Sequence, residues 1–186
     1  MNRALRVIAS IGIAVAAGWA VHGLYLRHVC NIREIQAERL VTKLFDINDQ
    51  ITARIAARDT VEIMNRCVPC APTDINQYMI RGAALRMLGR PDEAALDYRR
   101  ALHLDRRAEL FLNLGRAEME AGHDDAAADA LITAVYLVYS YVDDLPQPMQ
   151  DRVRNAVTPT YLMIQQGRAP HAVLEQLSDR VARDPR

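Results

Sequence analysis

This 186-residue chain has almost no lysine, few aromatic residues and no net charge. Lys43 is the only lysine among 23 basic residues, and 23 acidic residues balance them, so the formal net charge is zero. Without a basic excess the chain lacks the charge that holds nucleic acid, and no acidic tail is present. Aromatic residues make up only 5%, whereas alanine is abundant, which suits closely packed helices better than sheets. The preference for arginine over lysine is typical of GC-rich bacterial genes.

The residue sets that carry catalysis or hold metals are also missing. Three cysteines leave no second pair for a zinc site, and no histidine follows Cys70 as haem attachment requires. The five histidines form no pair at helical spacing, and no phosphate-cradling glycine loop or Ser, His and Asp arrangement is recognisable. We therefore expect no enzymatic activity, no cofactor and no metal.

The chain contains an internal repeat with a period of 33 residues. Eight positions are identical when residues 78–104 are shifted forward by 33. These identities are Gly82 with Gly115, Ala84 with Ala117, Gly89 with Gly122, Asp92 with Asp125, Ala94 with Ala127, Ala95 with Ala128, Ala101 with Ala134, and Leu104 with Leu137. A period of this length indicates stacked supersecondary units. Gly89 and Gly122 mark the turn inside each unit, where a positive φ ends a helix.

The repeat resembles the tetratricopeptide repeat (TPR) family of helix-turn-helix units. That family places an aromatic residue and then a small residue in its first helix, followed by small, large and small residues in its second. The matching residues are Tyr78, Gly82, Ala94, Tyr98 and Ala101 in one unit, and Phe111, Gly115, Ala127, Leu131 and Ala134 in the next. The match covers residues 75–141, although the proline that ends a unit in the family is missing at Arg106 and Tyr139. The resemblance implies an all-α solenoid in which small residues allow close helix packing.

TPR domains mostly bind peptides or helices in a concave groove that is lined by the first helix of each unit. By this register the groove-facing residues are Asn76, Met79, Ala83, Arg86, Leu112, Asn113, Arg116 and Glu120. The Lys and Asn residues with which some members clamp a terminal carboxylate are not at the matching positions. Arg86, Asn113 and Arg116 could still bind an acidic segment. The alternative is a solvated helix face without a ligand.

Residues 7–26 form a run of twenty residues without a formal charge, and as a helix they would span roughly 30 Å, the thickness of the hydrocarbon core. Trp19 and Tyr25 lie in its second half, where aromatic rings favour the interface. We expect a retained single-pass anchor in a bacterial inner membrane, with the N-terminus inside and the soluble domain in the periplasm. The alternative is a signal peptide cleaved after Ala16.

The rest of the chain also has helical patterns. Residues 31–58 predict one long amphipathic helix, and residues 61–66 a second helical stretch. Thr73-Asp74 predicts the N-cap of a helix that ends near Leu88. Residues 149–166 and 171–183 predict a degenerate third hairpin that caps the stack. The predicted regions are a tail (1–6), a transmembrane helix (7–26), a membrane-proximal helical region (31–72), two TPR units (73–142) and a capping hairpin (146–186).

Cys67 and Cys70 form the only motif with chemical character. Their spacing favours a structural disulfide in an oxidising compartment. The alternatives are inert reduced thiols or a redox-active pair, although no β-α-β pattern of a thioredoxin fold surrounds the motif.

Three functions fit these features. The first is a membrane-anchored TPR scaffold that binds a protein partner, a peptide or helix in the groove, and supports assembly of an envelope complex. The second is a structural subunit of a larger membrane complex, held through the anchor and residues 31–58, with self-association also possible. The third is a thiol-redox protein that works through Cys67 and Cys70. The missing catalytic residues favour the first.

Overall fold

All regular structure that the computed structural model describes is helical, which confirms the all-α prediction. The described residues are 3–44, 50–69 and 71–165, together with positions 175, 179 and 181. In chain order the elements are α1 (Arg3–Leu44), α2 (Gln50–Cys67), α3 (Ile75–Met87), α4 (Pro91–Leu104), α5 (Ala108–Glu120), α6 (Asp124–Leu137), the 3-10 helix η1 (Tyr139–Asp144) and α7 (Gln147–Gln165).

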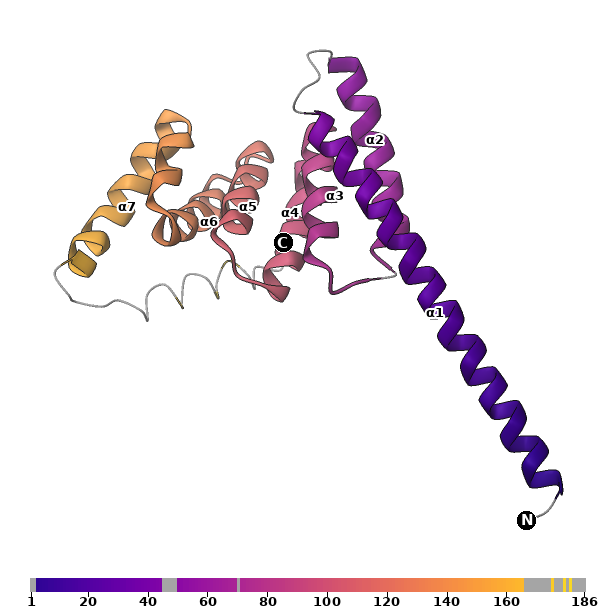
Figure 1. Ribbon diagram of the computed structural model, residues 1–186. Coiled ribbons are helices and arrows are strands. Elements are labelled where there is room, and N and C mark those ends of the chain that lie inside the picture. The colour runs from indigo at the N-terminus through magenta and orange to yellow at the C-terminus, as the bar shows by residue number, and fades with distance from the viewer. Residues whose placement is uncertain are drawn as a thin grey trace.

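α1 is a single helix of 42 residues, and at about 1.5 Å per residue it is about 63 Å long. Its second half packs beside α2 and touches α3, while its first half extends away from the other helices (Figure 1). Residues 7–26 therefore belong to the projecting part. Among the described residues, no helix is long and apolar enough to cross a membrane.

The prediction of one helix over residues 31–58 is wrong. α1 ends at Leu44, and α2 begins at Gln50 and packs against α1. Asp46, Asn48 and Asp49 follow α1 in the sequence, and residues of these types are weaker helix formers. The apolar residues of this stretch continue in phase, but they belong to two helices.

The pairs α3–α4 and α5–α6 have closely similar turns. Gly89 and Gly122 have φ angles of 72° and 82°, as predicted for residues just past a helix end. Behind Gly89, the Arg90 N–H donates to the Leu85 carbonyl at 3.0 Å; behind Gly122, the His123 N–H donates to the Glu118 carbonyl at 2.8 Å. These bonds satisfy carbonyls that a helix end leaves open.

Close packing inside each pair depends on a glycine that faces a large side chain. A Cβ atom on Gly82 would lie 2.9 Å from ring atoms of Tyr98, and one on Gly115 would lie 2.5 Å from Cγ of Leu131. The two contacts are equivalent under the 33-residue shift. The large side chain thus fills the space over the glycine of its own pair.

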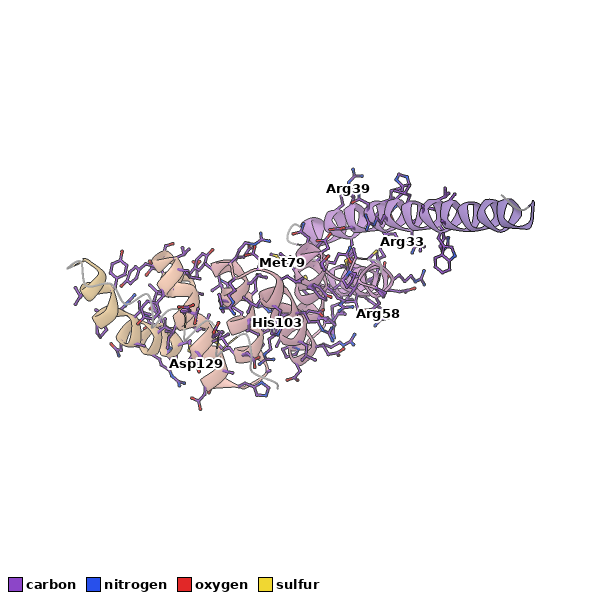
Figure 2. All side chains as sticks on the ribbon, turned by 90° about the horizontal axis from the view of Figure 1, so that it is seen from below. Arg33, Arg39, Arg58, Met79, His103 and Asp129 are labelled. Atoms are coloured by element: carbon purple, nitrogen blue, oxygen red, sulfur yellow. The ribbon has the colours of Figure 1, made fainter. Side chains whose placement is uncertain are left out.

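Buried side chains form one main core that runs from α2 through α7. Its largest fully buried members include Tyr98, Phe111, Leu102, Leu110 and Leu131, and alanines fill the helix crossings. A smaller cluster joins Ala37 of α1 to Met64 and Cys67 of α2, with Ile80 of α3 packed against it. α1 is therefore tied to the helical pairs by apolar contacts. In Figure 2, Met79 lies toward the side of α1, and His103 and Asp129 lie toward the opposite side.

The C-terminal part differs from the prediction. α6 ends at Leu137, not near Tyr141, because Val138 has extended backbone angles (φ −141°, ψ 97°) and the chain continues as η1. Branched and aromatic residues crowd this stretch, and they are weaker helix formers. α7 begins at Gln147 and continues past Pro159. Most of the predicted helix over residues 171–183 lies outside the described residues.

Candidate functional site

A hollow in the described part of the molecule lies where α1 meets the start of α3. This cavity of about 690 Å³ is open to solvent. It is lined by Arg27, Asn31 and Glu34 of α1, the loop residues 71–74, Ile75, Asn76 and Gln77 of α3, and Arg107 just before α5. Three segments distant in sequence therefore build one site.

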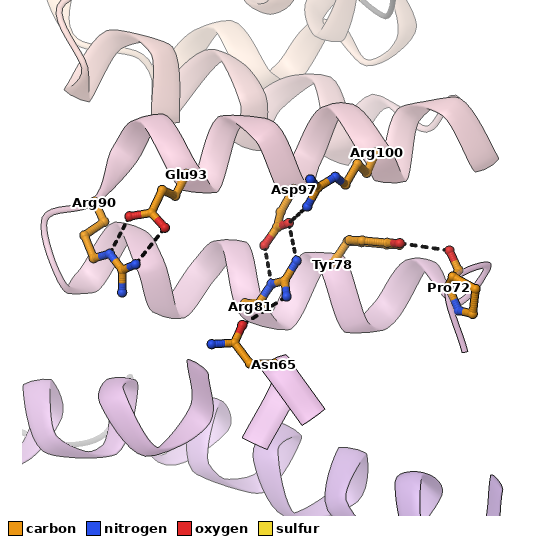
Figure 3. A network of polar contacts seen from close by, with 8 residues as sticks. All are labelled: Asn65, Pro72, Tyr78, Arg81, Arg90, Glu93, Asp97 and Arg100. Atoms are coloured by element: carbon orange, nitrogen blue, oxygen red, sulfur yellow. Dashed lines mark hydrogen bonds and ion pairs between the residues drawn. The ribbon is translucent and has the colours of Figure 1, made fainter. Parts of the chain in front are cut away.

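The backbone around the cavity is fixed by local hydrogen bonds. Asp74 has extended backbone angles, and its Oδ1 accepts from the Asn76 N–H at 3.0 Å. Of the two predicted residues, Thr73 and Asp74, Asp74 is therefore the N-cap of α3. The Tyr78 hydroxyl donates to the Pro72 carbonyl at 2.9 Å and holds the loop against the helix (Figure 3). The cavity wall is thus built on a capped helix end.

The charges of the lining are balanced. Arg27 and Arg107 contribute two cations, and Glu34 and Asp74 contribute two carboxylates. Arg107 also pairs with Asp105, whose Oδ2 lies 2.7 Å from its Nε. Such a lining can bind a ligand that carries both a positive and a negative charge.

Gln77 is the unusual polar group of the site. Its side chain is 1% exposed, and its Nε2 donates to Glu34 Oε2 over a long distance of 3.4 Å. Its Oε1 is buried and has no hydrogen-bond partner among the described residues. A buried acceptor without a partner costs about 1–3 kcal/mol, so the arrangement favours a donor brought from outside.

The predicted groove residues lie on α3 and α5, and only Asn76 lines the cavity. Asn76 and Glu120 are exposed, and Leu112 is 6% exposed within the core, so it offers little surface to a partner. The remaining predicted residues are partly buried: Met79, Ala83, Arg86, Asn113 and Arg116.

Arg86 and Glu120, both predicted in the groove, form an ion pair between α3 and α5. Arg86 Nε donates to Glu120 Oε2 at 3.0 Å, and Nη2 donates to Oε1. Burial lowers the pKa of Arg86, but the hydrogen bond and charge of Glu120 outweigh it, so the pKa is raised overall. Burial raises the pKa of the neighbouring Tyr98 to about 12, although the charge of Arg86 opposes this. Arg86 is thus engaged and is not a free anion receptor.

A buried ionic network holds α3 against α4 and α2 (Figure 3). Arg81 Nε and Nη2 donate to the two carboxylate oxygens of Asp97 at 2.6 and 2.7 Å, and Asp97 is 2% exposed. Arg81 also donates to Asn65 Oδ1 of α2 at 3.1 Å. The hydrogen bond to Asp97 is the main reason that the pKa of Arg81 is raised. This network fixes the helix that carries the cavity wall.

A second buried carboxylate, Glu118 of α5, links this helix to α4 and to the turn before α6. Glu118 is 2% exposed and pairs with Arg99 of α4, and its Oε2 lies 2.8 Å from His123 Nδ1. Neither network was found by sequence reasoning, because their members differ between the two repeats: Leu114 stands where Arg81 would recur. In the sequence, the only sign of these networks would be a charged residue at a position on the apolar face of a helix.

Cys67 is fully buried at the end of α2. Its predicted disulfide partner, Cys70, lies outside the described residues, so the disulfide stays a prediction. Within the described part of the chain, no group of three His, Cys, Asp or Glu residues is placed to hold a metal ion.

Comparison with known proteins returns no relatives. No family model matches the chain, no curated protein is significantly similar, and no solved structure matches its fold.

Proposed function

We propose that this chain is a membrane-anchored scaffold of the TPR type, and that it binds a protein partner on the face formed by α1, α3 and α5. The observation that carries the proposal is the surface along α3 and α5, which the Arg86–Glu120 ion pair joins and where Asn113 and Arg116 remain partly exposed. A site assembled from consecutive helical units and open to solvent suits contact with a chain segment better than enclosure of a small substrate.

The repeated details of the two helical pairs support the TPR assignment. The positive-φ glycines and the glycine contacts with Tyr98 and Leu131 recur at the same register. Close approach over a small residue, followed by a glycine turn, is what stacked helical units require.

The anchor rests on residues 7–26 and on the surface of the projecting part of α1. Trp19, Leu24 and Tyr25 are 75, 67 and 63% exposed there. Large apolar side chains gathered on one segment are typical of a surface covered by lipid or by another protein. We place the protein in the bacterial inner membrane, with the helical pairs in the periplasm.

A second candidate, a structural subunit of a membrane complex, is favoured by the apolar surface near the α1–α2 junction. Ile51 and Ile55 of α2 are 71 and 55% exposed, and Ile35 of α1 is 44% exposed. Thiol chemistry has less support. Reactive cysteines are generally partly exposed, whereas Cys67 is buried.

Site-specific photo-crosslinking of the full chain in native membranes tests the proposal. A photoreactive residue is placed at Asn113 or Arg116 on the proposed face, at Ile51 or Ile55 on the apolar surface of α2, and at Leu96 or His103, which are exposed on α4. We expect a defined protein adduct from the first set and none from the α4 controls. Adducts only from Ile51 or Ile55 would favour the structural subunit, and adducts from α4 alone would refute the proposed face.

A further inference from the structure

We propose that the cavity between α1 and α3 binds a phospholipid head group that carries a primary ammonium beside its phosphate, as phosphatidylethanolamine does. This inference rests on the membrane anchor proposed above and gives the anchored domain a ligand at the membrane surface.

The position of the cavity brings it to the head groups. Arg27 lines it and directly follows residues 7–26, and the exposed Tyr25 and Leu26 lie within the preceding turn of α1. Aromatic and basic residues at the end of an apolar helix lie at head-group depth. α1 and α3 are each packed against α2, and the start of α3 lines the cavity together with Arg27.

The charges of the cavity suit a zwitterion. The phosphate would lie beside Arg27 and Arg107, the two cations of the lining. Glu34 and Asp74 would repel a ligand that is only anionic, but they attract an ammonium. A ligand with both charges therefore fits better than inorganic phosphate or a wholly acidic peptide.

Gln77 selects among zwitterions. The carboxylate of Glu34 accepts from Nε2 and thereby orients the amide, leaving Oε1 as the acceptor without a partner. Gln77 itself lines the cavity, so a donor bound there lies beside its amide. A primary ammonium has N–H groups to donate, whereas the trimethylammonium of phosphatidylcholine has none. The site should therefore distinguish these two lipids, which share the same phosphate.

Competition between the two lipids tests the inference. The full chain in detergent micelles is offered equal amounts of phosphatidylethanolamine and phosphatidylcholine of matched acyl chains, and the retained lipid is identified by native mass spectrometry. We expect a preference of about tenfold for phosphatidylethanolamine, the effect of one charge-assisted hydrogen bond. Gln77→Leu should abolish the preference, and Arg27→Gln should weaken retention of both lipids. Arg39→Gln, an exposed control on α1, should change neither.

Two further readouts keep the result interpretable. Thermal melting establishes that Gln77→Leu is folded, and Arg27→Gln alters an exposed residue, so it tests the site without a core change. Glycerophosphoethanolamine should shift the NMR signal of the Gln77 side-chain amide, but with weaker affinity than the lipid. Binding as tight as that of the lipid would assign the site to a soluble phosphoethanolamine compound and overturn the lipid inference.

Other outcomes also decide the matter. Equal retention of the two lipids, or a preference that survives Gln77→Leu, would overturn the inference, as would crosslinks from Asn31 to protein but not to lipid. Carbonate extraction of native membranes reports on the anchor separately. If the chain resists extraction but shows no lipid preference, the anchor stands and only the head-group site is wrong. If carbonate extracts the chain, the anchor is wrong, and both proposals that depend on it fail.

Discussion

The Arg86 guanidinium and the Glu120 carboxylate form a double hydrogen bond that joins α3 to α5 across 34 residues of sequence. Both side chains come from the first helix of a pair, so the bond links neighbouring pairs on the face proposed to bind a partner. Because the pair is partly exposed, we expect a coupling energy of only about 0.5–1 kcal/mol.

A double-mutant cycle with Arg86→Ala and Glu120→Ala, followed by urea denaturation, measures this coupling. It should shrink as salt is added, because partly exposed charges are screened. A coupling near zero at low salt would mean that the pair does not hold the helices together.

The contact between Gly115 and Leu131 predicts a strong effect of one methyl group. Alanine is the better helix former by about 1 kcal/mol, but its Cβ would overlap Leu131 Cγ at 2.5 Å and also approach the Ala127 carbonyl at 3.2 Å. We expect Gly115→Ala to lower the free energy of unfolding by about 1–3 kcal/mol. Leu131→Ala is itself destabilising because it removes a fully buried side chain, but in that background Gly115→Ala should cost less. Strictly additive losses in the double variant would contradict the packing argument.

Asp97 is predicted to be far more sensitive than Glu93, although both bind arginine on the same helix pair. Asp97 is buried and receives two hydrogen bonds from Arg81, whereas the Glu93 pair with Arg90 is about half exposed. Asp97→Asn should cost about 3 kcal/mol, because it leaves Arg81 without its counter-charge in a buried position. Glu93→Gln should change stability by less than about 0.5 kcal/mol. Similar losses in urea unfolding of the two variants would show that burial does not govern the Asp97 pair.

The repeated parts of the fold were predictable because small residues and turn glycines recur at a spacing of 33 residues in the sequence. Gly89 and Gly122 predicted the turns with their positive φ angles, and Thr73-Asp74 predicted the start of α3. The break between α1 and α2 was missed, since apolar residues continue in helical phase through Ile47 and Ile51. Periodicity reports which face is buried, but it does not report where a chain folds back.

The candidate site was predictable only in part, for a similar reason. Asn76 was expected from the register of α3, but Arg27, Glu34 and Arg107 were not. They lie outside the repeat, and only packing of α1 beside α3 brings them together. Gln77 was also missed, because a buried glutamine without a full set of hydrogen bonds cannot be distinguished in sequence from a solvated one.

Tyr98 predicts a specific loss of stability in alkali. Burial raises its pKa to about 12, compared with 10.0 in the unfolded chain, so the folded state holds the phenol proton more tightly. The stabilisation is fully present below pH 10 and is lost as the pH rises toward 12, because the unfolded chain releases this proton first. The slope should reach about 1.4 kcal/mol per pH unit, the effect of one proton.

Tyr98→Phe keeps the ring that packs over Gly82 but removes the titrating hydroxyl, so its unfolding free energy should fall less steeply over this range. Tyr139→Phe, at a site that is 38% exposed, is the matched control and should leave the slope unchanged. Urea unfolding at intervals between pH 9 and 12 measures all three proteins. If Tyr98→Phe and the parent lose stability in parallel, the buried phenol does not control alkaline unfolding, and the decline must arise from groups that both proteins share.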